Sequence, residues 1–106
     1  MEKFKMGAKR QKFNVSVYAG SGKMQTEPTT GYFVKAADFP GITFMVHREL
    51  GEKYWTLSEF RTGRRFPRGG FTREEVIKTG LTIMETMKIT ADTIKNEVWP
   101  IYPAVN

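Results

Sequence analysis

The feature that most constrains the fold is a change of hydrophobic period near residue 72. Upstream, apolar residues alternate with polar ones in short runs, as in residues 13–17, which read FNVSV. This period of two is typical of half-buried strands. Downstream, apolar or small residues recur every three or four positions between Val76 and Val98, the spacing of a helix that buries one face. The order predicts an α+β fold: an antiparallel β-meander of about four strands, followed by a long C-terminal helix packed on one face of the sheet.

The start of the helix carries a strong local signal. Thr72 and Glu75 have the spacing of a capping box, in which the threonine hydroxyl accepts from the amide of the glutamate and the glutamate side chain reaches back. Phe71 and Val76 occupy the two positions of a hydrophobic staple. These features predict a helix that begins at about Arg73.

The end of the helix is marked less sharply. The apolar stripe allows one helix over residues 73–98, ended before Pro100. The β-branched residues at positions 89 and 90 disfavour helix and allow a break near Lys88. An uninterrupted stripe would extend beyond a small sheet and would be covered by a second copy, with Gly80 permitting close approach. This reasoning predicts a homodimer through the C-terminal helix.

Four strands are expected before the helix. They cover residues 13–18, 32–36, 42–48 and 54–60, and loops are expected at residues 19–31 and 62–70, which are rich in turn-forming residues. The last two strands should form an antiparallel hairpin. Residues 1–12 hold five basic residues and one acidic residue, which predicts a basic flexible arm on a single domain spanning residues 1–106.

Composition narrows the possible partners. The net charge of +6 favours anionic partners, namely nucleic acid, a nucleoprotein or an acidic protein surface, and argues against a mimic of DNA. The chain has no cysteine, which excludes disulfides and thiolate-bound metals. No apolar run approaches the roughly 18 residues that a membrane span needs. We therefore expect no membrane partner and a cytoplasmic location.

No arrangement of catalytic residues stands out. Residues 20–23 read GSGK, but the glycine and the hydroxyl residue that a phosphate-binding P-loop needs at its two ends are absent. His47 is the single histidine, and no thiolate is available to complete a metal site. A set made of Ser58, His47 and Glu59 lacks the sequence context of a nucleophile elbow. We predict a protein that is not an enzyme and has no catalytic residues, no metal and no cofactor.

The strongest candidate for a functional site is the segment of residues 61–73. It reads RTGRRFPRGGFTR and holds five arginines and no acid. Arginine presents a planar fork that grips phosphate or carboxylate and stacks on bases, and interleaved aromatic residues are typical of surfaces that bind single strands. The alternative is a solvated loop whose arginines pair with nearby acids. The predicted binding residues are Arg61, Arg64, Arg65, Phe66, Arg68, Arg73, Tyr54 and Phe60.

Two of these residues, Tyr54 and Phe60, are predicted on the outward face of the last strand, opposite Trp55 and Leu57. Three arrangements are open for such aromatic rings. They would stack on bases, hold a dimer together, or lie under a second layer formed by the N-terminal arm or the C-terminal tail.

A resemblance adds to these expectations. Residues 44–48 (FMVHR), 54–58 (YWTLS), 62–63 (TG) and 71–77 (FTREEVI) resemble a pattern of small accessory proteins of bacteriophages and mobile elements. The resemblance implies a non-enzymatic accessory protein in the cytoplasm of a bacterial host. It implies either a protein that binds nucleic acid or a nucleoprotein complex through the arginine loop, or an anti-CRISPR-like inhibitor that occupies the nucleic-acid-binding groove of a host defence nuclease. The order of meander and helix also resembles dimeric single-strand-binding proteins.

Overall fold

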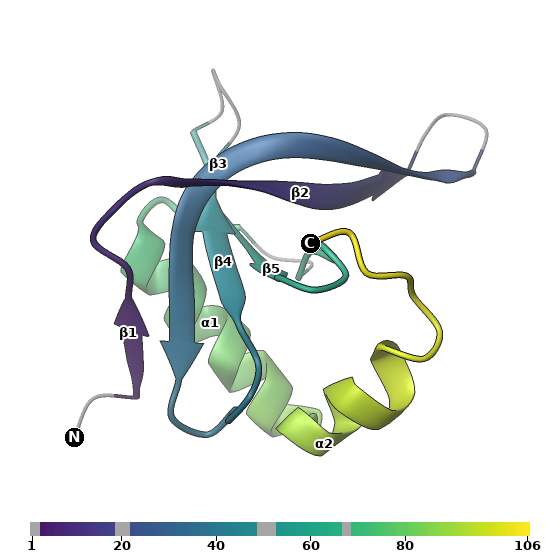
Figure 1. Cartoon of the computed structure of the whole chain (residues 1–106). Coiled ribbons are helices and arrows are strands. Elements are labelled where there is room, and N and C mark those ends of the chain that lie inside the picture. Colours follow the sequence, from purple (N-terminus) through teal and green to yellow (C-terminus); the bar gives the residue numbers. More distant parts are fainter. Residues whose placement is uncertain (1–2, 19–21, 49–52, 67–68) are drawn as a thin grey trace.

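The computed structural model describes residues 3–18, 22–48, 53–66 and 69–106 (Figure 1). It confirms the α+β class, since an antiparallel sheet comes first in the chain and helices follow. The strands are β1 (Phe4–Met6), β2 (Gln11–Tyr18), β3 (Met24–Ala36), β4 (Phe44–His47) and β5 (Thr56–Glu59), and the helices are α1 (Arg73–Thr86), α2 (Ala91–Thr93) and a π-helical turn, η1 (Ile94–Val98). No helix in this part of the chain is long and apolar enough to cross a membrane.

Strand β3 organises the sheet because it pairs with three other strands. Its first part, residues 24–31, runs antiparallel to β2. Its second part pairs with β4 through residues 31–34 and with β1 through residues 34–36. Strands β4 and β5 form the predicted antiparallel hairpin. Figure 1 shows β3 as a long bent strand, and its bend carries β2 across the rest of the sheet.

The loop predicted for residues 19–31 is wrong from residue 24 onward, because residues 24–31 belong to β3; residues 19–21 lie outside the described residues. Pro28 lies within this stretch although proline has no N–H to donate to a ladder. Its partner across the ladder, Asn14, directs its own backbone N–H and C=O to the side chain of Asn106, at 2.8 Å each. No ladder bond is therefore required of Pro28 at this pair.

The flexible arm predicted for residues 1–12 is also wrong where the structure describes it. Residues 4–6 form β1, paired with β3, and residues 11 and 12 begin β2. Phe4 and Met6 pack against the main core while Lys5 between them is exposed. The backbone adds two bonds at the ends of β1, from Gly7 N–H to Phe33 O (2.7 Å) and from Ala37 N–H to Lys3 O (2.9 Å). The many lysines of residues 1–12 led to the prediction of a flexible arm, although Phe4 and Met6 alternate with Lys5 as in a strand.

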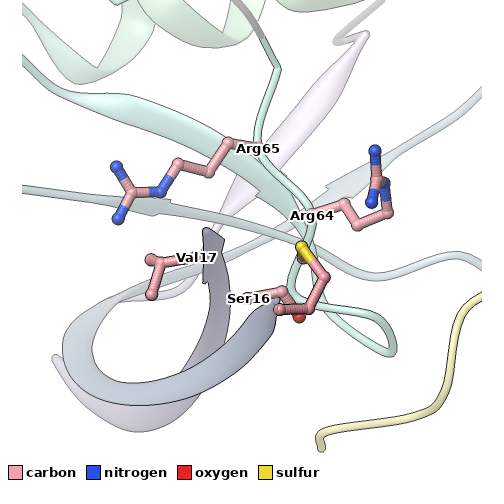
Figure 2. Close-up of a pocket in the computed structure, with 5 residues that line it drawn as sticks. Ser16, Val17, Arg64 and Arg65 are labelled. Carbon is pink, nitrogen blue, oxygen red and sulfur yellow. The ribbon is translucent and has the colours of Figure 1, made fainter. Parts of the chain in front are cut away.

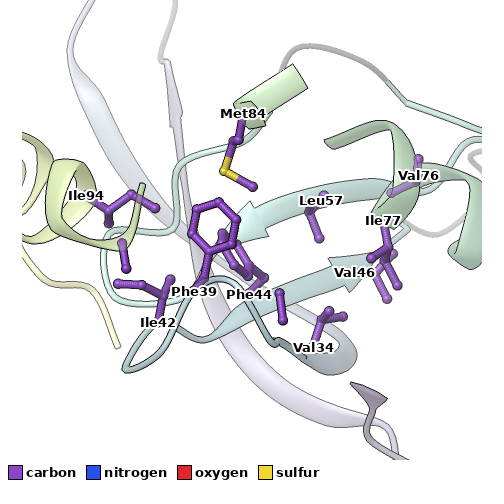
Figure 3. Close-up of a cluster of buried hydrophobic side chains, with 12 residues drawn as sticks. Val34, Phe39, Ile42, Phe44, Val46, Leu57, Val76, Ile77, Met84 and Ile94 are labelled. Atoms are coloured by element: carbon purple, nitrogen blue, oxygen red, sulfur yellow. The ribbon is translucent and has the colours of Figure 1, made fainter. Parts of the chain in front are cut away.

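Two hydrophobic clusters lie on the two sides of β4. The larger one lies beneath α1 and contains Phe44, Val46, Leu57, Ile77 and Met84 (Figure 3). The smaller one contains Phe13, Val15 and Met45, with Val17, Phe33 and Phe60 packed around it. The alternation predicted along residues 42–48 is confirmed, and both faces of β4 are buried because β2 covers the second one.

Helix α1 approaches the sheet closely at Gly80. A Cβ atom built at Gly80 would lie 2.5 Å from Leu57 Cδ2 of β5, so a side chain there would force either the Leu57 side chain or the helix to shift. Gly80 therefore serves contact within the chain. Ala91 and Ile94, farther along the stripe, are buried in the same cluster. The stripe is thus largely covered by the chain itself, and the homodimer through the C-terminal helix stays a prediction.

The single helix predicted over residues 73–98 is wrong, and the chain breaks where the β-branched residues allowed it. Lys88 adopts a left-handed conformation, with φ of 58°. The Lys88 N–H bonds to Glu85 O (3.1 Å), and the Ile89 N–H bonds to Met84 O (2.8 Å). This is the bonding of a Schellman motif, which ends a helix and is usually built on glycine. Thr90 then caps α2 through a reciprocal bond pair with Thr93.

Helix α1 begins at Arg73, as predicted, and the threonine bond of the predicted capping box is present and testable. The Thr72 hydroxyl accepts from the Glu75 N–H at 3.1 Å. Thr72→Ala should lower the free energy of unfolding by about 1 kcal/mol, because one amide of the first turn loses its partner. Urea unfolding followed by circular dichroism measures the change. Thr82→Ala is the matched control, because Thr82 is exposed inside α1. Alanine favours the helix more than threonine does, so this variant should not lose the stability that Thr72→Ala loses.

The break at Lys88 gives a second stability prediction. Lys88→Gly should raise the free energy of unfolding by up to about 1 kcal/mol, because glycine adopts positive φ without the Cβ clash. Met87→Gly is the control, since Met87 has φ of −84° and needs no glycine. It should lower the stability instead. Equal destabilisation by the two substitutions in urea unfolding would contradict the left-handed assignment.

Candidate nucleic-acid interface

The described parts of the arginine segment pair their backbone with the edge of β5 and with Trp55 just before it. The Glu59 N–H bonds to Arg64 O (2.9 Å), and the Phe66 N–H bonds to Leu57 O (2.8 Å). Farther along, Trp55 and Gly70 exchange two bonds of 2.8 and 3.1 Å. Residues 64–66 and 69–70 thus extend the sheet beyond β5, where a loop was predicted.

The carboxylate of Glu59 holds the turn that precedes these arginines. It is 5% exposed. It accepts from the Arg61 N–H (2.5 Å), the Thr62 N–H (3.2 Å) and the Thr62 hydroxyl (2.7 Å). It also accepts from Trp99 Nε1 at 3.1 Å. Glu59 therefore fixes the turn and ties it to the C-terminal part of the chain.

The C-terminal residues complete this connection. The Val105 N–H donates to Arg61 O (2.7 Å), and the Asn106 side chain donates to Phe60 O (2.6 Å) and to Asn14 O (2.8 Å). The Asn14 side chain donates in return to Val105 O (3.0 Å). The last two residues of the chain are thus bound between β2 and the turn after β5.

The turn also reaches β2 directly. The Ser16 N–H bonds to Gly63 O (2.9 Å), and the Ser16 hydroxyl donates to Thr62 O (2.6 Å). Gly63 has φ of 66°, and a Cβ there would lie 2.8 Å from Ser16 N. The turn requires glycine at this position for both reasons.

Aromatic side chains hold two of the predicted arginines. The guanidinium of Arg61 lies 4.8 Å from the ring centre of Trp99, and that of Arg64 lies 3.7 Å from the ring centre of Tyr102. These cation–π contacts orient the cations while most of their N–H groups stay available as donors.

Arg64 and Arg65 line an open pocket of about 370 Å³ together with Ser16, Val17 and Met24. Figure 2 shows the two guanidinium groups on the loop that follows β5, pointing to either side, with Val17 and Ser16 of β2 facing them. The pocket combines cationic groups with an apolar wall. The fold places two consecutive site residues, Arg64 and Arg65, beside residues of β2 and β3.

The structure places the other predicted residues elsewhere. Phe66 packs on Phe44 of the main core, with ring centres 6.0 Å apart, and Phe60 packs edge-on against Phe33 at 5.4 Å. Both rings serve packing, so we leave them out of the site. The second layer considered for Phe60 is present, and β2 and the C-terminal tail supply it. Arg68 lies outside the described residues.

Tyr54 pairs with Phe71 on the surface. The ring centres are 5.0 Å apart, and the side chains are 51% and 65% exposed. The staple predicted between Phe71 and Val76 gives way to this contact, since Phe71 is mostly exposed and Val76 is buried. Arg73 lies beside other rings, 4.5 Å from the centre of Tyr32 and 5.6 Å from that of Trp55.

His47 and Ser58 form a buried pair. His47 Nε2 lies 2.7 Å from Ser58 Oγ, and both residues are 1% exposed. The Glu59 carboxylate binds its own turn and Trp99, so the three residues do not assemble as a Ser–His–acid set. Within the residues described, no group of acidic or histidine side chains has an arrangement that could hold a metal ion.

No protein family, curated protein or solved structure matches this chain. The resemblance to phage accessory proteins therefore stays a prediction, and function has to be inferred from geometry and charge.

The role of Glu59 is testable as stability. Glu59→Gln should lower the free energy of unfolding by about 1–3 kcal/mol, because an amide nitrogen replaces one acceptor among buried donors. Urea unfolding gives the value. Glu85→Gln, at an exposed position of α1, removes the same charge and should leave stability nearly unchanged. A Glu59→Gln protein as stable as the control would contradict the role given to this carboxylate.

Proposed function

We propose that this protein binds single-stranded nucleic acid, alone or within a nucleoprotein, at the pocket lined by Arg64 and Arg65. The observation that carries the proposal is the pairing of two guanidinium groups with an open pocket of about 370 Å³. Arginine is suited to phosphate because its planar fork donates two parallel hydrogen bonds. The net charge of +6 favours a polyanion in the same way.

The apolar part of the pocket supports a single strand over a duplex. Val17 and Met24 offer a nonpolar wall beside the cations. A base in a duplex is stacked and paired, so it reaches a recess only when it is unstacked, which a single strand allows at little cost. A nucleotide would place its phosphate on Arg64 or Arg65 and its base against the apolar wall.

The biological setting belongs to the same proposal. A basic protein that binds strands without performing chemistry fits an accessory protein of a phage or mobile element, acting in the cytoplasm of a bacterial host. This setting is supported by the sequence resemblance and by the cation-rich pocket.

A second candidate, inhibition of a host defence nuclease complex by protein–protein contact, is favoured by a different observation. Tyr54 and Phe71 form an exposed aromatic pair. Exposed aromatic residues beside arginine are typical of the energetic centre of protein interfaces. In this candidate the arginines would meet the acidic or nucleic-acid-binding groove of the partner.

Fluorescence anisotropy with labelled single- and double-stranded oligonucleotides at two salt concentrations tests the first candidate. Arg64→Gln/Arg65→Gln should weaken single-strand binding and reduce the salt slope by about 1.4, roughly 0.7 for each lost phosphate contact. Arg65 is exposed and Arg64 is half-buried on Tyr102, so the free energy of unfolding should fall only by about the 0.5–1 kcal/mol that a cation–π contact contributes. Lys5→Gln/Lys78→Gln, at two exposed positions, removes the same charge elsewhere and should have a much smaller effect.

Equal losses in the two double variants would show nonspecific attraction and overturn the pocket as the site. Wild-type affinity no higher than that of an unrelated protein of equal charge would overturn nucleic-acid binding altogether. In that case Phe71→Ser should abolish capture of a partner from nuclease-treated bacterial lysate, as the second candidate requires.

A further inference from the structure

A second group of arginines lies away from the pocket, around two aromatic rings. Arg48 lies 4.8 Å from the ring centre of Trp55, and Arg73 lies 5.6 Å from the same centre. Arg73 also lies 4.5 Å from the centre of Tyr32, and Arg10 lies 5.9 Å from it. The two rings are neighbours, with centres 6.4 Å apart. We name these five residues the arginine–aromatic cluster.

The fold gathers the cluster from five separate parts of the chain. Arg48 directly follows β4, and Arg73 is the first residue of α1. Tyr32 belongs to β3, opposite Val46 of β4. Trp55 precedes β5 and is fixed by its two backbone bonds to Gly70.

The charges of the cluster lack compensation among the described residues. None of its three arginines makes an ion pair with a carboxylate there, although Glu74 directly follows Arg73 in the sequence. Arg10 and Arg48 are exposed and Arg73 is half-buried. A ring face holds a guanidinium without using its N–H donors, which leaves the planar fork for another acceptor. Gathering like charges in this way is unfavourable until an anion joins them.

We propose that the arginine–aromatic cluster is a phosphate-binding site, separate from the pocket at Arg64 and Arg65. Each of the three guanidinium groups lies no more than 5.9 Å from the centre of one of two neighbouring rings, and guanidinium groups bind phosphate oxygens through charge-assisted hydrogen bonds. The nucleic-acid backbone as the source of that phosphate rests on the proposed function; the phosphate chemistry itself does not.

The two sites lie at opposite ends of the segment that pairs with β5. Arg65 stands opposite Ser58, and Gly70 stands opposite Trp55, so the anchor points are three residues apart along the strand. That separation is about 10 Å at the rise of an extended strand. Tyr32 and Trp55 pack toward the main core, whereas Val17, which lines the pocket, packs toward the smaller one.

The chain carries its own reporters for this proposal, because it has two tryptophans. Trp55 belongs to the cluster, whereas Trp99 lies beside Arg61 and Glu59. The two indole N–H signals in a nitrogen–proton correlation spectrum therefore report on two places, and a Trp99→Phe variant assigns them. Inorganic pyrophosphate and a short deoxythymidine oligomer are titrated separately into the full chain, against sodium chloride at equal ionic strength.

We expect a saturable shift of the Trp55 signal with both probes and none with chloride. Arg48→Gln/Arg73→Gln should weaken that response about tenfold or more, as expected from the loss of charged hydrogen bonds. Arg64→Gln/Arg65→Gln should leave the response to pyrophosphate unchanged. Arg48→Lys/Arg73→Lys keeps the charge and loses the fork, so it should bind more weakly than wild type and better than the glutamine variant. Circular dichroism verifies that each variant is folded.

The outcomes separate this proposal from the proposed function. A Trp55 response to pyrophosphate without any response to the oligomer supports the phosphate site and counts against nucleic acid as the ligand. A Trp55 response that survives Arg48→Gln/Arg73→Gln overturns the cluster as the binding site. Absence of a response to both probes overturns it as well.

Discussion

The buried carboxylate of Glu59 is the interaction on which the arrangement of the arginines depends. Removing a carboxylate from water is unfavourable unless hydrogen bonds replace its hydration, and Glu59 receives four of them from Arg61, Thr62 and Trp99. The same bonds fix the turn before Arg64 and hold the C-terminal helical turn against it. Trp99 and Tyr102, the rings that receive Arg61 and Arg64, are positioned by this connection. A structural anion thus determines where neighbouring cations lie.

The bend of β3 has a comparable effect on the whole molecule. Because β3 pairs with β2 in its first part and with β1 and β4 in its second, β2 covers the face of β4 that α1 leaves open. The chain therefore builds two small clusters where one was expected. Burying both faces of a sheet raises the apolar area that a short chain removes from water, which compensates for its large surface. This arrangement also leaves two separate surfaces beside β5 on which cationic groups can gather.

The elements predicted correctly from the sequence are those that a few adjacent residues determine. The cap at Thr72, the alternation along residues 42–48 and the hairpin of β4 and β5 are each visible in a few adjacent residues. Residues 24–31 and β1 were missed because strand pairing overrides their composition: residues 24–31 pair with the preceding strand β2, and β1 pairs with the far end of β3. The five arginines of residues 61–73 were recognised as a cationic segment. The separation of Arg73 from Arg61 and Arg64 follows from rings at positions 32, 55, 99 and 102, which spacing in the sequence does not reveal.

The aromatic contacts that hold these arginines affect which ligands the arginines can bind. An arginine fixed by a carboxylate has its charge neutralised and its N–H donors occupied. An arginine fixed by a ring keeps its positive charge and its N–H donors available. Holding the side chain in advance also lowers the conformational entropy that an incoming ligand would otherwise have to remove. An exposed cation–π contact contributes only about 0.5–1 kcal/mol, so folding stability alone is a weak reason to gather Arg10, Arg48 and Arg73 around Tyr32 and Trp55. Cations held in advance, with no ion-pair partner among the residues that the structure describes, are better suited to recognising an anion than to stabilising the fold.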